Sequence, residues 1–306
     1  MTRGMQELVA SAAVAFVGIT WGCWWIFLRL IEATGISPGW TLAVVYGGAA
    51  IMLAPLFAWR WRRWRPMVWS VVIVGVGYGL PLAFWSHAVI HGNVVRVTLL
   101  FYLTPVWGTV LAALVFRERL TPLRLLSVAF GLIGATAVLG IEDGFPVPAT
   151  AQEWMALLAG ALFAVAAAAS RIWPDVSGYD SSFVMFVTSA VLGVVFAGLF
   201  GAETMPSAAS VLQSVPLVIF LAVVFAIPSQ FLLAWAATKL DPGRVSTLIL
   251  FDVLATTVSA RILTNEPFGW PEAIGCLFIL GTGVASGIDQ MRQGRAAPVQ
   301  QPAASR

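Results

Sequence analysis

Residues 96–122, "RVTLLFYLTPVWGTVLAALVFRERLTP", return in altered form as residues 244–270, "RVSTLILFDVLATTVSARILTNEPFGW". The two stretches align without a gap at an offset of 148 residues, which pairs Arg96 with Arg244 and Glu118 with Glu266. Each copy begins with about 20 mostly apolar residues, the length that a helix needs to cross a bilayer. The repeat therefore indicates a duplicated membrane helix, and the remainder of the chain decides how the two copies are oriented.

The composition is that of an integral membrane protein. Of the 306 residues, 59% are hydrophobic and 10% are charged, whereas about a quarter of the residues in a soluble domain are charged. Ten apolar blocks are long enough to span a membrane, and the short connectors leave no room for a separate soluble domain. The predicted spans are residues 8–31, 39–58, 67–90, 95–116, 123–141, 153–173, 182–201, 211–237, 244–263 and 270–288.

The repeated stretches are the fourth and the ninth of these spans, so they must cross the membrane in opposite directions. We therefore predict an all-α polytopic membrane protein, with ten transmembrane helices in two inverted five-helix repeats around a central cavity. This organisation is common among secondary transporters. The first repeat covers residues 1–147 and the second covers residues 148–290, and the polar residues 291–306 are expected to form a disordered cytoplasmic tail.

The basic residues predict the orientation. If the N-terminus is inside, fourteen of the seventeen lie in inner connectors or termini, and only Arg29, Arg96 and Arg261 lie outside. Cytoplasmic loops carry such an excess, so both termini are expected in the cytoplasm, with the protein in a bacterial cytoplasmic (inner) membrane. The stretch "WRWRRWRP" (59–66) is then an interfacial anchor that contacts membrane lipid, with a lipid-regulatory site as the alternative. The formal charge of +3 does not imply a nucleic-acid partner.

The third and eighth spans each contain a proline near mid-span, Pro81 and Pro228. Proline removes one ladder hydrogen bond and clashes with the preceding turn, so we expect each helix to kink or break there. Carbonyl groups freed at membrane depth need polar partners, and Gln230, beside Pro228, is one candidate. Paired interruptions in corresponding helices point to a transport site, although prolines are also ordinary in membrane helices.

Two motifs of the first half resemble a known family. The stretch "TWGCWWIFLRL" (20–30) has the pair Trp21–Gly22 and a basic residue, Arg29, eight positions after the tryptophan. The fourth span has a mid-helix proline, Pro105, and ends on "ER" at residues 118–119. Together with the duplication and the ten spans, these features resemble the EamA family of the drug/metabolite transporter superfamily over both halves.

The resemblance implies ten helices that enclose a central cavity, with the fifth and tenth helices peripheral, and transport by alternating access. It does not imply a substrate, because members move very different small molecules. The chain departs from the family pattern at two places: members often have Glu-Pro in mid-helix, where this chain has Thr104–Pro105 in the first copy and Asp252–Val253 in the second.

Asp252 is the one acidic residue predicted to lie deep in a span. A charged Asp at a helix centre costs about 2.5–3.5 kcal/mol, so a specific role is expected. Asp252, Thr256 and Ser259 share one helix face, which favours an aqueous cavity over lipid. The functional interpretations are proton coupling and direct substrate contact. The structural alternative is a carboxylate that pairs with an arginine or caps the amides of a broken helix.

Aromatic residues in the first, third and fourth spans are candidates for the cavity wall, because small-molecule sites are commonly built from rigid aromatic groups and a few polar ones. The aromatic candidates are Trp21, Trp25, Tyr78, Trp85, Tyr102 and Trp107. Plain packing is the alternative for each. Arg29, Arg96 and Arg244 are candidate mouth charges that attract a substrate carboxylate, or helix-end anchors that snorkel to the interface.

The sequence favours a secondary transporter that exports small polar or amphipathic metabolites, such as amino acids, with the proton as a candidate coupling ion. An uptake or exchange carrier for organic acids or amines is the alternative. A membrane-embedded enzyme needs convergent reactive groups, and the sequence has one deep carboxylate and no metal-binding spacing. We therefore expect no catalysis, no cofactor and no metal, and a monomer or a loose dimer.

Overall fold

The computed structural model describes residues 3–115, 117, 120–139, 147–199, 204–240, 242–264 and 268–296. Within these ranges every regular element is a helix. Glu118, Arg119 and Glu266, which carry part of the repeat or of the family motif, lie outside the described residues.

The first half of the chain forms α1 to α8. Their bounds are α1 Arg3–Gly22, α2 Trp24–Glu32, α3 Pro38–Trp59, α4 Trp61–Trp64, the 3₁₀ helix η1 Arg65–Met67, α5 Val68–His91, α6 Val94–Phe101, α7 Thr104–Leu114 and α8 Pro122–Leu139. The second half forms α9 to α15. Their bounds are α9 Ala151–Ile172, α10 Gly178–Leu199, α11 Ala208–Phe220, the π-helical segment η2 Leu221–Ala226, α12 Ile227–Ala237, α13 Pro242–Leu248, α14 Phe251–Leu263 and α15 Trp270–Ala296.

The described residues contain nine helical segments that are long and apolar enough to cross a membrane. The ninth predicted span, residues 244–263, is divided into α13, with 7 residues, and α14, with 13, so neither part reaches membrane length alone. The described residues are therefore all-helical and membrane-spanning in character, with nine candidate spans in place of ten. The last helix, α15, extends to Ala296 and so enters the segment 291–306 for which a tail is expected; residues 297–306 lie outside the described residues.

The fourth predicted span is also interrupted, between α6 and α7, and the two interruptions have the same hydrogen-bond pattern. The backbone N–H of Leu103 donates to the Leu100 carbonyl (3.2 Å), and that of Leu250 donates to the Thr247 carbonyl (3.3 Å). Bonds of this i to i−3 type tighten the chain into a 3₁₀ turn. The turns fall at residues 102–103 and 249–250, within one residue of the offset of the sequence repeat.

The two prolines behave differently. The helix α5 continues from Val68 to His91 through Pro81 without a break. Pro228 is the second residue of α12, which begins directly after the π-helical segment η2, where the helix is locally widened. Because Pro228 lacks an N–H group, the α-helical ladder cannot be completed before it, and single π-turns commonly appear at such places. The expected interruption therefore occurs in the second half and takes the form of a π-turn.

Close contacts between helices depend on glycine. A Cβ added to Gly22 of α1 would lie 2.4 Å from the Asp252 carbonyl oxygen of α14. A Cβ on Gly160 of α9 would lie 2.6 Å from the Phe101 carbonyl oxygen of α6. Small residues let membrane helices approach this closely. Both interrupted helices are therefore held at their turns by the backbone of a neighbouring helix.

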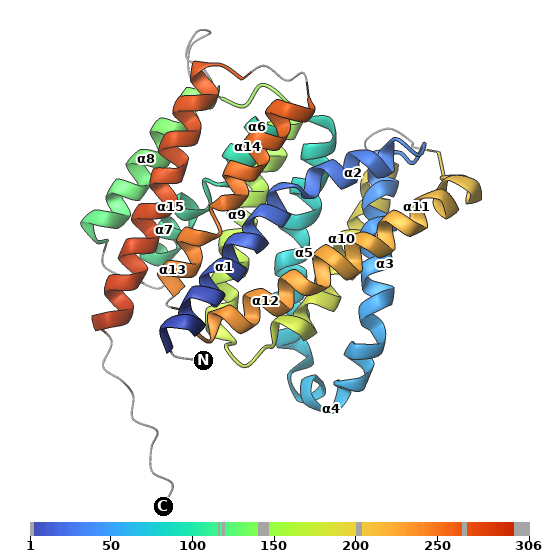
Figure 1. Cartoon of the computed structure of the whole chain (residues 1–306), viewed down its shortest axis with the longest axis horizontal. Helices are drawn as coiled ribbons and strands as arrows, with labels where there is room; N and C mark the ends of the chain where they lie inside the picture. Colours follow the sequence, from blue (N-terminus) through green and yellow to red (C-terminus); the bar gives the residue numbers. More distant parts are fainter. Residues whose placement is uncertain are drawn as a thin grey trace, which may run out of the picture.

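One side of the helix bundle is formed by a pair of helices, α8 and α15. The helices α8 and α15 pack along each other with glycines on both sides and lie together at one side of the bundle (Figure 1). The elements α4, the start of α1 and the end of α15 all lie toward the lower part of the same view. Among the described residues, the largest fully buried side chain is Tyr46 of α3, which accepts a hydrogen bond from Trp24 (3.1 Å) and contacts the hydroxyl of Ser86 (2.5 Å).

Candidate functional site

Asp252 lies in the first turn of α14, directly after the turn at residues 249–250, and only 8% of it is exposed. The sequence suggests a mid-helix position, and the helix interruption changes this to the N-terminal end of a helix. The aligned peptide dipoles of a helix give its N-terminal end a partial positive charge, which stabilises a carboxylate. The interruption therefore lowers the electrostatic cost of this acidic residue.

Two hydroxyl groups contact the Asp252 carboxylate. The Tyr102 hydroxyl donates a hydrogen bond to Oδ2, and Thr256 Oγ1 lies 3.2 Å from Oδ1. Tyr102 belongs to the turn between α6 and α7, so the turns of the two interrupted helices meet at this bond. Among the described residues, no Arg, Lys or His forms an ion pair with Asp252. The arginine pairing considered from the sequence is therefore not found in this part of the chain.

The polar face of α14 packs against the first helices. Thr256 is fully buried, and its hydroxyl lies 3.1 Å from the Gly22 carbonyl oxygen as well as near Asp252. Because a hydroxyl has one hydrogen, it donates to one of these acceptors at a time. Further along, Trp25 Nε1 donates to Ser259 Oγ (3.1 Å). The predicted residues Trp25, Thr256 and Ser259 are thus brought together, at a helix contact that joins the two halves.

An aromatic series continues from Tyr102 across α9 to α5. The Phe101 ring contacts Phe163 at 5.7 Å between centroids, and Phe163 contacts Tyr78 at 5.3 Å. Trp85 lies 6.4 Å from Phe101, and its Nε1 is buried without a hydrogen-bond partner among the described residues. A buried donor without a partner costs free energy that a ligand or water can recover. Trp85 Nε1 is therefore a buried donor beside Phe101 that has no partner in the described part of the chain.

Sequence reasoning missed Phe101 and Phe163, because nothing in their spacing separates them from phenylalanines that face lipid. It also missed Ser229, which is buried and lies 3.4 Å from the Thr20 hydroxyl across the α1–α12 contact. The position of Ser229 directly after Pro228 is a signal that could have identified it, since polar groups are needed where a helix ladder is incomplete.

Other predicted cavity residues stand apart from Asp252. Pro81 is buried within α5, whereas Pro228 and Gln230 are half-buried in the first turn of α12. Trp21 is half-buried on α1, and Trp107 on α7 is 37% exposed. None of these side chains has a described hydrogen bond to the Asp252 group.

Two of the predicted mouth charges hold helix ends together. Arg29 donates to the carbonyl oxygens of Val89 (3.1 Å) and Gly92 (2.8 Å). Arg96 contacts the carboxylates of Glu153 (3.2 Å) and Glu272 (3.6 Å). These arginines join α2 to the end of α5, and α6 to α9 and α15.

The third predicted mouth charge, Arg244, is in a looser environment. It lies 3.8 Å from Glu7, and both side chains are more than a third exposed. Arg96 lines a cavity of about 480 Å³ at the opposite end of the bundle, together with His91, Asn93, Thr150, Gln152, Glu153 and Glu272. The repeat-related arginines Arg96 and Arg244 thus have unequal surroundings.

Comparisons with known proteins show what the chain is similar to. A solved structure titled "Crystal structure of protein" is 21% identical, with a TM-score of 0.55 over 95% of this chain and 99% of that chain, which shows a shared fold. No curated protein matches. The model of the EamA-like transporter family matches residues 9–140, which run from α1 to the end of α8. This match covers most of the first predicted repeat, and this part of the chain is similar to the EamA-like transporter family, which belongs to the drug/metabolite transporter superfamily.

Proposed function

We propose that the chain is a secondary-active transporter that exports small polar or amphipathic metabolites, such as amino acids or related compounds, from a bacterial cytoplasm by alternating access. The observation that carries this proposal is the hydrogen bond between Tyr102 and Asp252, which joins the turns of two interrupted helices. Secondary transporters commonly build their sites where interrupted helices meet near the middle of the membrane. A small-molecule substrate and contact with membrane lipid follow from the family.

An inverted repeat is part of the proposal, and the helix contacts support it. If each helix is replaced by its counterpart in the other half, one contact between helices becomes another. The contact of α1 with α14 corresponds to the contact of α9 with α6 and α7. In the same way, α1 packs on α12 as α9 packs on α5, and α3 packs on α11 as α10 packs on α5. The pair α8 and α15 maps onto itself. A pseudo-two-fold axis in the membrane plane would produce these pairs.

We propose that α13 and α14 together form one more span, the ninth in chain order, which is interrupted at residues 249–250 and brings the total to ten. Residues 242–263 then cross the membrane as a unit, which makes the number of spans even and puts both termini in the cytoplasm. The excess of basic residues on that side supports the orientation.

Asp252 is proposed to couple the transport cycle to a proton. As a carboxylate it accepts a charge-assisted hydrogen bond from Tyr102, and such bonds are roughly twice as strong as neutral ones. A proton on Asp252 removes that assistance and weakens the contact between the two turns. Proton binding would then favour separation of the turns, which is what coupling of a proton to alternating access requires.

An exchange or uptake carrier for organic acids or amines is the second candidate. It is favoured by the absence of a described cation beside the Asp252 carboxylate, because a substrate amine would supply the missing charge. In that case Asp252 would contact substrate directly and no proton would be needed.

The first step of the test is to find a substrate, by a thermal-shift screen of the purified chain against amino acids, organic acids and amines at two pH values. The compound that stabilises most is then used in proteoliposomes with Asp252→Asn. We expect this variant to lose accumulation driven by a pH gradient while it keeps exchange of substrate across the membrane.

Asp175→Asn is the matched control, since Asp175 is an exposed carboxylate outside the predicted spans. Loss of both exchange and accumulation in Asp252→Asn would support direct substrate contact instead of proton coupling. Gradient-driven accumulation at the wild-type rate would remove Asp252 from the mechanism altogether.

A further inference from the structure

The corner between α3 and α5 lies at the boundary of two membrane-length helices. The candidate spans Pro38–Trp59 and Trp61–His91 meet there, with the short elements α4 and η1 at the junction. Its sequence, "WRWRRWR" (59–65), alternates tryptophan with arginine. A corner of this kind sits at the level of the lipid headgroups, whatever the direction of transport.

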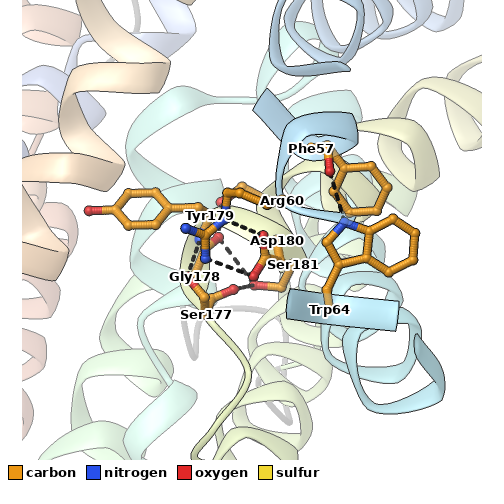
Figure 2. A network of polar contacts seen from close by, with 9 residues as sticks. Phe57, Arg60, Trp64, Ser177, Gly178, Tyr179, Asp180 and Ser181 are labelled. Carbon is orange, nitrogen blue, oxygen red and sulfur yellow. Dashed lines mark hydrogen bonds and ion pairs between the residues drawn. The ribbon is translucent and has the colours of Figure 1, made fainter. Parts of the chain in front are cut away.

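One arginine of the corner, Arg60, forms an ion pair with a buried carboxylate of the protein. Arg60 Nε and Nη2 donate to the two carboxylate oxygens of Asp180, at 2.7 and 3.0 Å, and Asp180 is buried (Figure 2). The guanidinium also lies 5.7 Å from the centre of the Tyr179 ring. Because Asp180 and Tyr179 belong to α10, this contact fixes the corner of the first half to the second half.

The aromatic side chains of the corner are held in the same way. Phe57 stacks on Trp64 at 4.3 Å and on Phe183 of α10 at 4.2 Å. The indole N–H of Trp64 donates to the Phe57 carbonyl oxygen (2.8 Å), as Figure 2 shows. The corner is therefore a rigid surface with a defined shape.

The other three arginines, Arg62, Arg63 and Arg65, are exposed, and no described carboxylate forms an ion pair with any of them. Arg65 lies 5.9 Å from the centre of the Trp61 ring, which leaves its N–H groups available. Trp59 and Trp61 beside them are 81% and 48% exposed. Three uncompensated cations and two exposed indoles thus share one rigid corner.

We propose that this corner, residues 59–65, is a binding site for the headgroup phosphate of an anionic phospholipid. The guanidinium group presents a planar fork of N–H donors that matches phosphate oxygens, and it is more weakly hydrated than an ammonium group. Exposed tryptophans beside it suit the interface between headgroups and acyl chains. A lipid bound here holds the α3–α5 corner, and through Arg60 and Asp180 it stabilises the contact between the two halves.

The test measures binding of phosphatidylglycerol to the purified full-length chain in a neutral detergent, with phosphatidylcholine as the uncharged comparison. The variant is Arg62→Gln, Arg63→Gln and Arg65→Gln combined. We expect native mass spectrometry to show at least a tenfold loss of retained phosphatidylglycerol. We also expect the increase in melting temperature that this lipid gives the wild type to disappear, because a ligand of the folded state stabilises it only while it binds.

The matched control removes three other exposed cations, by Arg117→Gln, Lys239→Gln and Arg261→Gln. It should keep the preference for phosphatidylglycerol. An equal loss in both triple variants would mean that net charge alone attracts the lipid, and an unchanged preference in the corner variant would mean that the lipid binds elsewhere; either result overturns the proposal.

Two further arms complete the test. Inorganic phosphate at millimolar concentration should not reproduce the stabilisation, and if it does, the site serves a soluble phosphate compound instead of a lipid. If the triple variant does not fold, Arg63→Gln alone should lose lipid about fivefold, and no loss would contradict the proposal.

Discussion

At the scale of single residues, Asp252 and its counterpart in the first half differ in the partners of their side-chain hydrogen bonds. The sequence alignment pairs it with Thr104, whose hydroxyl donates to the nearby Phe101 carbonyl oxygen at 2.7 Å. That bond stays within the turn between α6 and α7. Asp252 instead accepts a bond from Tyr102 in the other half. The exchange of a threonine for an aspartate therefore converts a local contact into one that joins the two halves.

The contribution of this contact can be measured with Tyr102→Phe. A hydrogen bond to a charged group contributes about 1.5–3 kcal/mol, so we expect Tyr102→Phe to lower the free energy of unfolding by about this amount. In a chain that already carries Asp252→Asn, Tyr102→Phe should lower the free energy of unfolding by less, because the carboxylate charge that accepts the Tyr102 hydrogen bond is absent. Thermal unfolding of both single variants and the double variant gives the coupling energy, which should be about 0.5–3 kcal/mol.

Tyr78→Phe is the control for that cycle, since the Tyr78 hydroxyl accepts a neutral hydrogen bond from Ser170 (3.2 Å). It should cost less and show no coupling to Asp252→Asn. Additive effects of Tyr102→Phe and Asp252→Asn would contradict the contact.

At the scale of helices, the interruption of α13 and α14 depends on packing. The segment "TLILFDVL" (247–254) contains no glycine or proline that would end a helix. The α1 backbone at Gly22 lies directly against the Asp252 carbonyl, and the chain is tightened into a 3₁₀ turn just before that contact. The turn is therefore an outcome of tertiary structure that a local sequence signal does not record.

Gly22→Ala tests this close contact. The added Cβ would lie 2.4 Å from the Asp252 carbonyl oxygen and 2.9 Å from the Thr256 backbone nitrogen, so α1 and α14 must separate. Overpacking of this kind usually costs about 1–3 kcal/mol, and we expect a lower melting temperature and slower transport. Gly108→Ala, with no atom within 4 Å of the added Cβ, should be neutral or stabilising by up to about 1 kcal/mol, since alanine favours helix more than glycine does. Equal melting temperatures for the two variants would show that α1 does not constrain α14.

These elements show what the sequence could predict. Helix positions followed from the length of the apolar blocks, so most predicted spans lie within a few residues of the observed helices. The polar residues of α14 were found because hydroxyl and carboxyl groups are rare inside a span. Phe101, Phe163 and the turn at 249–250 were not predicted, because their roles depend on which neighbouring helix lies against them, and that information is not local.

At the scale of the whole molecule, the repeat-related arginines at the two ends of the bundle form ion pairs of different strength. Arg96 contacts the carboxylates of two buried residues, Glu153 and Glu272, and also donates to the Val138 carbonyl oxygen (2.6 Å). Its repeat partner Arg244 forms one described ion pair, a long and exposed one with Glu7 (3.8 Å), within the part of the chain that the structure describes. Exposed ion pairs contribute about 0–1 kcal/mol, whereas loss of one member of a partly buried group leaves unsatisfied charges.

Arg96→Gln should therefore lower the free energy of unfolding by about 1–3 kcal/mol, and Arg244→Gln by less than about 1 kcal/mol. The two arginines are matched by the repeat, so each variant is the control for the other in the same thermal unfolding experiment. A larger effect of Arg244→Gln would show that the end of the bundle near Glu7 is the more firmly closed one.

The number of spans decides where the C-terminal end of α15 lies. If α13 and α14 cross the membrane together, the α4 corner and the end of α15 face the same side, and the start of α9 faces the other. In a chain carrying Cys23→Ala and Cys276→Ala, we expect Arg62→Cys and Arg292→Cys to resist a membrane-impermeant maleimide added to intact cells, and Ala149→Cys to react. All three should react in permeabilised membranes, which controls for access. Labelling of Arg292→Cys but not Arg62→Cys from outside would mean that α13 and α14 enter and leave the membrane on one side. In that arrangement the α13–α14 turn could not be the inverted counterpart of the turn between α6 and α7, and the two-fold relation proposed for the site would be lost.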